Sequence, residues 1–316
     1  MVREPHAGQK GETVGVAAIV VEDLHKCYDS IVALRGVSFE VADGEVFALL
    51  GPNGAGKTTT IEILEGLRAR DSGRVEILGF DPADRTTSRM MRERLGIVLQ
   101  ECAVEPFLTV REVLARHAAF YPTPIPVDQV IAAVGLTEKA DARVKSLSGG
   151  QQRRLDVGLG IVGRPDVIFL DEPTTGFDPA ARRDAWELVR ALRSHGATVL
   201  LTTHYMDEAE ALADRLAIIA DGAIVAEGTP ASLGQRDVGS VRIRFGLPDG
   251  LAIADLPIAA VTVDGYVEIE TTDEVGVLHR LTGWALSSGH KLPGLTVERA
   301  SLEDVYLRLT RSAVLR

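Results

Sequence analysis

The stretch Gly51-Pro52-Asn53-Gly54-Ala55-Gly56-Lys57-Thr58 fits the pattern G-x-x-x-x-G-K-[ST], which predicts a loop that wraps phosphate groups. Residues 45–50 before it are apolar like a strand, and residues 57–67 after it carry apolar side chains at helical spacing. Backbone N–H groups and the positive helix end can then face an anion. Lys57 supplies a point charge for the phosphates, and the Thr58 hydroxyl can bind Mg²⁺. A plain glycine turn before a helix is the alternative.

A second apolar run, residues 167–170, ends in the acidic pair Asp171 and Glu172. Because parallel strands deliver their carboxyl ends to one edge of the sheet, we expect this pair beside the phosphate loop. Successive strand residues point to opposite sides, so Asp171 can hold the metal while Glu172 orients and deprotonates the attacking water. Taken alone, such a pair is more often part of a turn.

Length and composition predict two unequal domains. The chain has 316 residues, of which 46% are hydrophobic and 25% charged, a globular mix in a chain too long for one average domain. Helices alternate with wholly apolar strands between residues 149 and 226, which predicts an α/β fold with a parallel sheet. Helical patterns at 109–121 and 127–134, separated by prolines, predict a helical insertion.

Charge and cysteine content disfavour several classes of protein. The net charge is -11, with 45 acidic and 34 basic residues and no basic cluster, so a nucleic acid partner is not expected. Cys27 and Cys102 cannot build a disulfide framework or a zinc site, and they suit a reducing cytosol. No apolar run approaches the ~18 residues of a membrane span, and residues 1–15 lack the apolar core of a secretion signal.

The stretch Leu147-Ser148-Gly149-Gly150-Gln151-Gln152-Arg153-Arg154 resembles the signature motif of the ABC ATPases, and the likeness to that family runs from residue 17 to about 230. In physical terms, Ser148 offers a hydroxyl and the two glycines expose N–H groups at the start of a helix, which makes a second phosphate grip. By itself, Ser-Gly-Gly would more often be a helix N-cap.

Further positions carry the resemblance. Tyr28 resembles the aromatic residue that stacks on adenine, although a single Tyr in a strand is usually a packing residue. Gln100 resembles the Q-loop glutamine that touches Mg²⁺ and senses the transport partner. The segment 176–178 resembles the D-loop, with Phe177 where many relatives carry Leu. His204 resembles the switch histidine that contacts the γ-phosphate; an isolated His is more often a surface or core residue.

The resemblance implies a site for ATP and Mg²⁺ that is completed by a homodimer, since in this family the signature of one subunit closes over the nucleotide on the phosphate loop of another. The implied catalytic residues are Glu172, His204, Gln100 and Asp178, and the implied metal ligands are Thr58, Gln100 and Asp171. The implied ATP contacts are Tyr28, Gly51, Pro52, Asn53, Gly54, Ala55, Gly56, Lys57, Thr58, Thr59, Ser148, Gly149, Gly150 and Gln151.

The expected organisation is an α/β P-loop ABC ATPase core with a mixed sheet, followed by a small α+β domain. We expect a flexible tail at 1–16, a nucleotide-binding domain at 17–235 with a helical subdomain at about 101–165, and an accessory domain at 236–316. Glycine, proline, serine and charge between residues 228 and 237 indicate the boundary. In relatives, the helical insertion receives a helix of the membrane subunit.

Two stretches, 301–310 and 203–210, resemble the exporter ATPases of the daunorubicin-resistance type. They imply a cytoplasmic subunit, peripheral on the inner face of the cell membrane, that powers an ABC-2 type permease exporting a drug, lipid or polysaccharide. An importer ATPase and a ribosome-associated ABC protein stay open as alternatives. The ending 301–310 weighs against the importer, and the single, acidic nucleotide domain weighs against the ribosome factor. Chromosome-maintenance relatives need long coiled coils, and no sustained heptads occur.

Overall fold

The computed structural model describes residues 17–98, 104–194, 196–234, 241–248, 250–263, 265–299 and Tyr306. The chain divides into two compact units, residues 1–224 and 225–316. The domain boundaries expected from composition remain predictions. No helix within the described ranges is long and apolar enough to cross a membrane.

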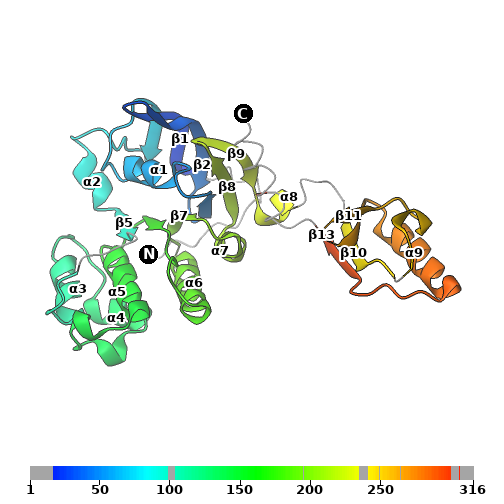
Figure 1. The fold of residues 1–316 in the computed structure, drawn as a ribbon. Coiled ribbons are helices and arrows are strands. Elements are labelled where there is room, and N and C mark those ends of the chain that lie inside the picture. Colours follow the sequence, from blue (N-terminus) through cyan, green and yellow to red (C-terminus); the bar gives the residue numbers. More distant parts are fainter. Residues whose placement is uncertain are drawn as a thin grey trace, which may run out of the picture. The chain divides into compact units, whose positions relative to one another are not determined.

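Two sheets organise the first unit (Figure 1). The antiparallel sheet has the order β2-β1-β4, with β1 at Ala17–Tyr28, β2 at Ile31–Ala42 and β4 at Ser72–Ile77. The larger sheet has the order β5-β6-β7-β3-β8-β9, with β3 at Val46–Leu50, β5 at Leu95–Val98, β6 at Val167–Asp171, β7 at Thr198–Thr203, β8 at Arg215–Ala220 and β9 at Ala223–Gly228. Its pairs from β5 to β8 are parallel, so the carboxyl ends of these strands share one edge.

The helices of the larger unit are α1 at Lys57–Leu64, α2 at Ser88–Arg92, α3 at Val110–Ala118, α4 at Val127–Ala133, α5 at Gly149–Ile161, α6 at Pro179–Ser194 and α7 at Met206–Leu212; α8 at Pro230–Gly234 follows β9. Two 3₁₀ turns at Thr137–Lys139 and Val144–Ser146 precede α5. Helices α3, α4 and α5 pack on one another, as expected for a helical insertion (Figure 1). Helix α1 ends before the predicted residue 67 because Gly66 adopts a left-handed φ of 72°.

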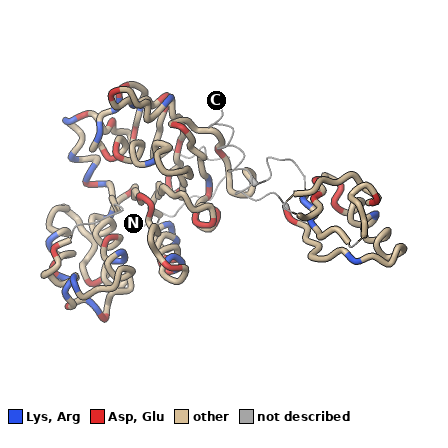
Figure 2. Tube along the Cα trace, in the orientation of Figure 1, with Lys and Arg blue, Asp and Glu red and all other residues tan. Residues whose placement is uncertain are grey.

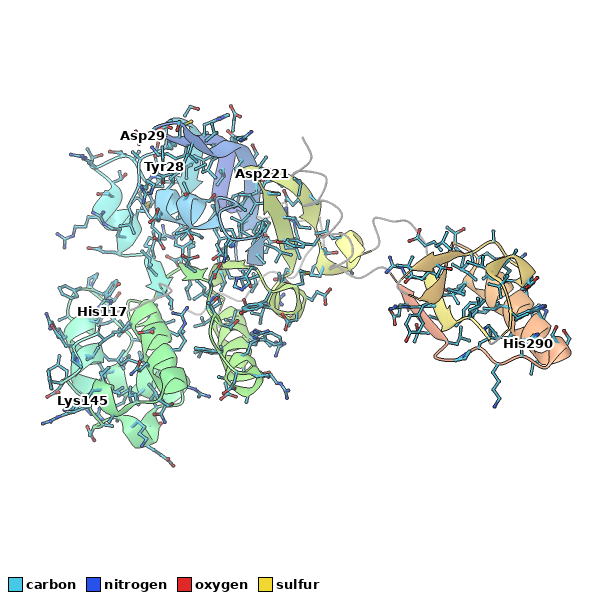
Figure 3. The ribbon with its side chains drawn as sticks, viewed as in Figure 1. Tyr28, Asp29, His117, Lys145, Asp221 and His290 are labelled. Atoms are coloured by element: carbon cyan, nitrogen blue, oxygen red, sulfur yellow. The ribbon has the colours of Figure 1, made fainter. Side chains whose placement is uncertain are left out.

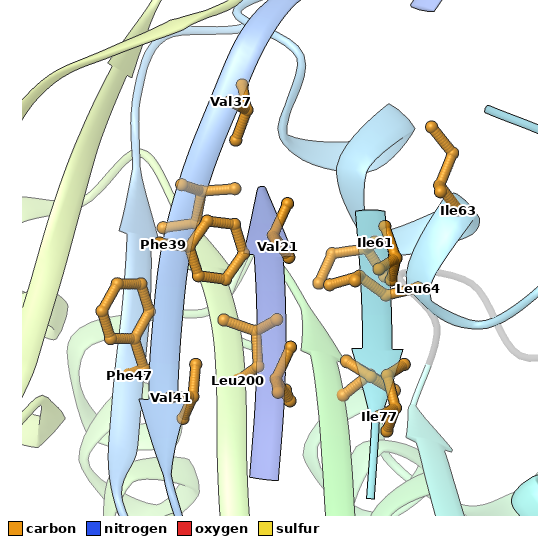
Figure 4. Close-up of a cluster of buried hydrophobic side chains, with 14 of the residues drawn as sticks. Val21, Val37, Phe39, Val41, Phe47, Ile61, Ile63, Leu64, Ile77 and Leu200 are labelled. Carbon is orange, nitrogen blue, oxygen red and sulfur yellow. The ribbon is translucent and has the colours of Figure 1, made fainter. Parts of the chain in front are cut away.

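One hydrophobic core joins α1 to both sheets (Figure 4). Ile61, Ile63 and Leu64 of α1 are at most 1% exposed. Phe39 of β2 and Phe47 of β3 stack with ring centroids 5.3 Å apart. Burying each such side chain stabilises the fold by roughly 1.5–3 kcal/mol. The core therefore holds the first turn of α1, and with it the phosphate loop, in place.

In the part of the second unit that the structure describes, a small antiparallel sheet packs against a helix. Its strand order is β11-β12-β10-β13, with β10 at Val241–Gly246, β11 at Val261–Val263, β12 at Tyr266–Thr271, β13 at Thr296–Arg299, a 3₁₀ turn at Ile253–Asp255 and α9 at Glu274–Ser288. Ile243 and Phe245 are buried with Val277 and Leu281 of α9. The helix predicted at 302–309 falls outside the described residues except for Tyr306.

Acidic and basic residues are interspersed along both units (Figure 2). Arg154 of α5 pairs with Asp184 of α6 at 2.7 Å, and Arg111 of α3 pairs with Asp128 of α4. Exposed pairs of this kind each contribute about 0–1 kcal/mol. They tie neighbouring helices together only weakly.

Glu65 is an acidic residue within the core. It caps α1, it is 1% exposed, and its carboxyl oxygens make no hydrogen bond to any part of the chain that the structure describes. Burial, with the negative charges of Asp171 and Glu62, raises the pKa of Glu65 from 4.5 to about 8. The folded chain therefore holds a proton that the unfolded chain releases, and stability declines as the pH rises between these two values.

Replacing Glu65 with Gln removes this titration while keeping the shape of the side chain. The free energy of unfolding of E65Q should rise relative to the unaltered protein by roughly 1 kcal/mol per pH unit between about pH 5 and about pH 8. Urea unfolding at several pH values measures the difference. The core variant I63V, on the same helix, should lose roughly 1 kcal/mol at every pH. If the difference in the free energy of unfolding between E65Q and the unaltered protein did not change with pH, Glu65 would not carry a proton in the folded chain.

Candidate nucleotide site

The glycine-rich loop joins β3 to α1 and closes around one ammonium group. Lys57 Nζ donates to the carbonyl oxygens of Gly51 at 2.8 Å and Pro52 at 3.1 Å. Gly56 adopts a φ of 107°, and a Cβ at this position would lie 2.7 Å from the Leu34 side chain. Only glycine fits there without strain, which explains this fixed position of the pattern.

The Glu172 carboxylate is the partner of that ammonium. Its Oε1 lies 3.2 Å from Lys57 Nζ, and its Oε2 accepts a hydrogen bond from the Thr175 hydroxyl at 3.0 Å. His204 Nδ1 lies 3.3 Å from the same Oε2 at an angle that makes no hydrogen bond. Burial raises the pKa of Glu172, but Thr175, Lys57 and His204 outweigh burial, and the pKa lies below its ordinary value. The site therefore holds Glu172 as a carboxylate.

The backbone at Glu172 is itself unusual. Its φ is 45°, in the left-handed region that non-glycine residues rarely adopt. Its N–H is shared between the carbonyl oxygen of Thr202 at 3.2 Å and the hydroxyl of Thr202 at 3.0 Å. Strain of this kind costs of order 1–3 kcal/mol and gathers at functional sites. The strained residue is thus the one whose carboxylate contacts Lys57 of the phosphate loop.

Asp171, the last residue of β6, faces the start of α1. It is 7% exposed, and its Oδ1 accepts a hydrogen bond from the Thr202 hydroxyl. Its Oδ2 lies 3.5 Å from the Thr58 hydroxyl. A carboxylate and a hydroxyl at this separation are the hard oxygen donors that Mg²⁺ prefers, and Mg²⁺ commonly takes its other ligands from phosphates and water. The residues present therefore fit Mg²⁺.

The phosphate loop opens into a hollow of about 320 Å³. Its lining residues are Ala33, Asn53, Gly54, Gly56, Lys57, Thr58, Thr59 and Glu172. Tyr28 does not line it: the ring lies at the end of β1, with Lys26 Nζ 5.5 Å and the Arg68 guanidinium 5.1 Å from its centroid (Figure 3). Of the ATP contacts predicted in the phosphate loop, the hollow is therefore lined by Asn53, Gly54, Gly56, Lys57, Thr58 and Thr59 but not by Gly51, Pro52 or Ala55. Tyr28 also lies outside it.

Ser148 begins α5 and lines a different hollow. Its hydroxyl accepts a hydrogen bond from the Gln151 N–H at 3.3 Å, and Gln151 Oε1 accepts one from the Ser148 N–H at 3.0 Å, which makes a capping box. Ser148 and Gly149 are exposed. Their hollow, of about 770 Å³, shares no lining residue with the hollow at the phosphate loop. One copy of the chain therefore presents the two predicted phosphate grips separately.

The predicted catalytic residues are only partly brought together. Glu172 and His204 lie side by side, as described above. Asp178 lines the hollow of Ser148, where its Oδ1 accepts hydrogen bonds from the N–H groups of Ala180 at 2.9 Å and Ala181 at 2.8 Å. Gln100 lies outside the described residues.

Thr202 and Thr175 were not predicted as site residues. Thr202 makes hydrogen bonds to both Asp171 and Glu172. The sequence could have indicated it, because the carboxyl ends of parallel strands share one edge of the sheet and Thr202 lies near the end of β7, as Asp171 lies at the end of β6. Asp171 and Thr202 are direct partners in the register of β6 and β7. No sequence pattern predicts the contact of Thr175 with Glu172.

Comparisons with known proteins show the family of the chain. The family model described as "ABC transporter" matches residues 34–175, and that described as "ABC transporter domain-containing protein-like, C-terminal domain" matches residues 241–301. The chain is 40% identical over 307 residues to a Nod factor export ATP-binding protein I of Burkholderia pseudomallei, covering 94% of this chain and 98% of that protein. It is 36% identical over 305 residues to a daunorubicin resistance ATP-binding protein of Streptomyces coeruleorubidus, covering 93% and 96%.

Solved structures confirm the predicted α/β fold. The cbiO1 protein of Clostridium perfringens, described as part of an ABC transporter complex, matches with a TM-score of 0.64 and 27% identity over 70% of this chain and 92% of that chain. An ATP-binding cassette in a dimeric post-hydrolysis state, bound to ADP and Pi, matches with a TM-score of 0.60 and 25% identity over 67% and 98%. From its fold, its phosphate loop and its relatives, the chain belongs to the ABC transporter family, among the ATP-binding proteins.

Proposed function

We propose that this chain is the ATP-binding and ATP-hydrolysing subunit that powers an ABC-2 type membrane exporter. The contact of Glu172 with both Lys57 and His204, beside the phosphate loop, is the observation that carries this assignment. Export is supported by the relatives named for Nod factor export and daunorubicin resistance, which align over 94% and 93% of the chain.

ATP binding begins with an exchange of partners at Lys57. The β- and γ-phosphates enter the hollow of the loop, where the N–H groups and the positive end of α1 face them. The ammonium then turns from the Glu172 carboxylate to the phosphate oxygens. Thr58 and Asp171 would hold Mg²⁺, which neutralises charge on the transferred phosphoryl group.

Hydrolysis uses the carboxylate that this exchange releases. Glu172 Oε1 loses its ammonium partner and becomes free to accept a proton from the attacking water, while Thr175 keeps the other oxygen in place. His204, beside the same carboxylate, reaches the γ-phosphate. We assign Gln100 to the metal and to sensing of the permease, and Tyr28 to the adenine, on family resemblance.

A second copy of the chain completes the site in this proposal. The exposed Ser148 and Gly149 of one copy, with the half-buried Gly150 and Gln151 beside them, close over the triphosphate on the loop of the other. Asp178 lies at the contact between the two copies. The separation of the two hollows within one copy supports this arrangement, as does the dimeric form of a related cassette. The dimer attaches to an integral permease on the inner face of the membrane.

Glu172→Gln should keep the shape of the site and remove the base. The turnover of ATP should fall by on the order of 10²-fold or more, while ATP binding persists and the ATP-bound dimer accumulates. Steady-state hydrolysis and size-exclusion chromatography with ATP measure both effects. Glu187→Gln, an exposed change on α6, serves as the control. Unaltered turnover in E172Q would exclude Glu172 as the base.

Lys57→Ala and Ser148→Arg should each abolish hydrolysis, since each damages both sites of a homodimer. Mixed in equal amounts, the two variants form heterodimers in which one site carries both substitutions and the other carries neither. Activity should return to about a quarter of the unaltered level, because half of the dimers contain one intact site. ATPase assays of the single and mixed preparations provide the comparison. No recovery in exchanging dimers would contradict a shared site.

Isolation of the tagged chain from membranes tests the transport assignment. We expect an integral permease of the ABC-2 type to copurify and to raise ATP turnover when reconstituted. Association with ribosomes and no membrane protein would replace export with the ribosome-factor alternative. Stimulation only by an external solute-binding protein would indicate the importer instead.

A further inference from the structure

The ring of Tyr205 connects the histidine of the site to a neighbouring helix. His204 follows β7, and Tyr205 immediately precedes α7. Their ring centroids lie 4.0 Å apart with an interplanar angle of 40°. The Tyr205 N–H donates to the Thr203 hydroxyl at 2.9 Å, which fixes the backbone between the strand and the helix. The imidazole thus has an aromatic neighbour outside the phosphate loop.

Arg182 of α6 lies over that same ring. Its guanidinium carbon is 4.1 Å from the Tyr205 centroid, close enough for a cation–π contact. Its Nη1 donates to Asp207 at 3.0 Å, and the Arg182 side chain is only 21% exposed. Its Nε makes no hydrogen bond to any described residue. The Arg182 guanidinium therefore contacts the ring of Tyr205 and the carboxylate of Asp207.

Two further residues of α6 contact α7. Trp186 Nε1 donates to the fully buried Glu208 at 3.2 Å, and Arg190 donates to the carbonyl oxygen of Ala211 at 3.2 Å. Positions 182, 186 and 190 recur every four residues and share one face of the helix. Helices α6 and α7 lie side by side (Figure 1). Among these three contacts, only that of Arg182 reaches the Tyr205 ring.

We propose that Arg182 and Tyr205 are positioning residues that hold the imidazole of His204 beside Glu172, an inference that rests on the proposed function. Helix α6 starts directly after Asp178, so the segment resembling the D-loop is joined through one rigid helix to the switch histidine. A displacement of residues 176–178 would then move α6 and the Arg182 guanidinium. Through the Tyr205 ring this movement would reach the His204 imidazole, which the proposed function places at the γ-phosphate. Neither residue lines the hollow of the phosphate loop or the hollow of Ser148.

Tyr205→Ala and Arg182→Gln should lower kcat for ATP by about tenfold and leave KM within about twofold, since they misplace a catalytic group without removing a binding contact. Tyr205→Phe keeps the ring and should retain kcat within about twofold. Arg190→Gln is the matched control, because it loosens the same helix pair two turns away from the rings. Assays use the full chain, with thermal unfolding recorded for each variant.

A double-mutant cycle tests whether the loss of kcat in Tyr205→Ala acts through His204. In a His204→Ala background, adding Tyr205→Ala should cause no further loss of kcat, whereas a general defect of folding would lower it again. If H204A and E172Q both keep unaltered turnover, the catalytic roles that the proposed function gives to His204 and Glu172 fail, and the positioning inference fails with them. If H204A is slow but Y205A and R182Q stay within about twofold of the unaltered chain, the positioning inference fails alone. An equal loss in R190Q also overturns it.

Discussion

The ammonium of Lys57 and the carboxylate of Glu172, 3.2 Å apart, balance each other in a site where their side chains are 4% and 12% exposed. An ammonium buried without a partner would cost several kcal/mol, so Lys57 leaves the carboxylate only when another negative charge takes its place. A triphosphate is such a replacement for the carboxylate. In the proposed mechanism, nucleotide binding and release of the Glu172 carboxylate are therefore a single exchange at Lys57, and Glu172 does not act as a base before ATP binds.

The parallel sheet brings the partners of this exchange to one edge. Leu50, just before the phosphate loop, pairs with Thr203, and Asp171 pairs with Thr202. The ends of β3, β6 and β7 therefore align, although long connections separate them in the chain. The core around α1 fixes the remaining partner, because Lys57 opens the helix whose apolar side chains lie between the two sheets.

The sequence predicts those parts of the site in which chemistry and spacing are local. The phosphate loop and the acidic end of β6 are short runs of consecutive residues, so both can be recognised in the sequence without knowledge of the fold. The contacts of Thr175 and Thr202 depend on tertiary placement, and threonine at a strand end is otherwise ordinary. Ser148 is a helix cap within one copy, as the alternative interpretation of Ser-Gly-Gly predicts. Its role as a second phosphate grip stays a prediction.

Phe177, the departure from the family pattern, lies where it cannot disturb the exchange at Lys57. Its ring lines the hollow of Ser148 and a smaller one of about 360 Å³ beside α5, and its N–H donates to the Thr174 carbonyl oxygen. The hollow of the phosphate loop does not include it. A bulky aromatic residue there changes the surface offered to a partner and leaves the buried charges alone. We therefore expect a substitution of Phe177 to affect assembly of the proposed dimer and to leave the contact between Lys57 and Glu172 intact.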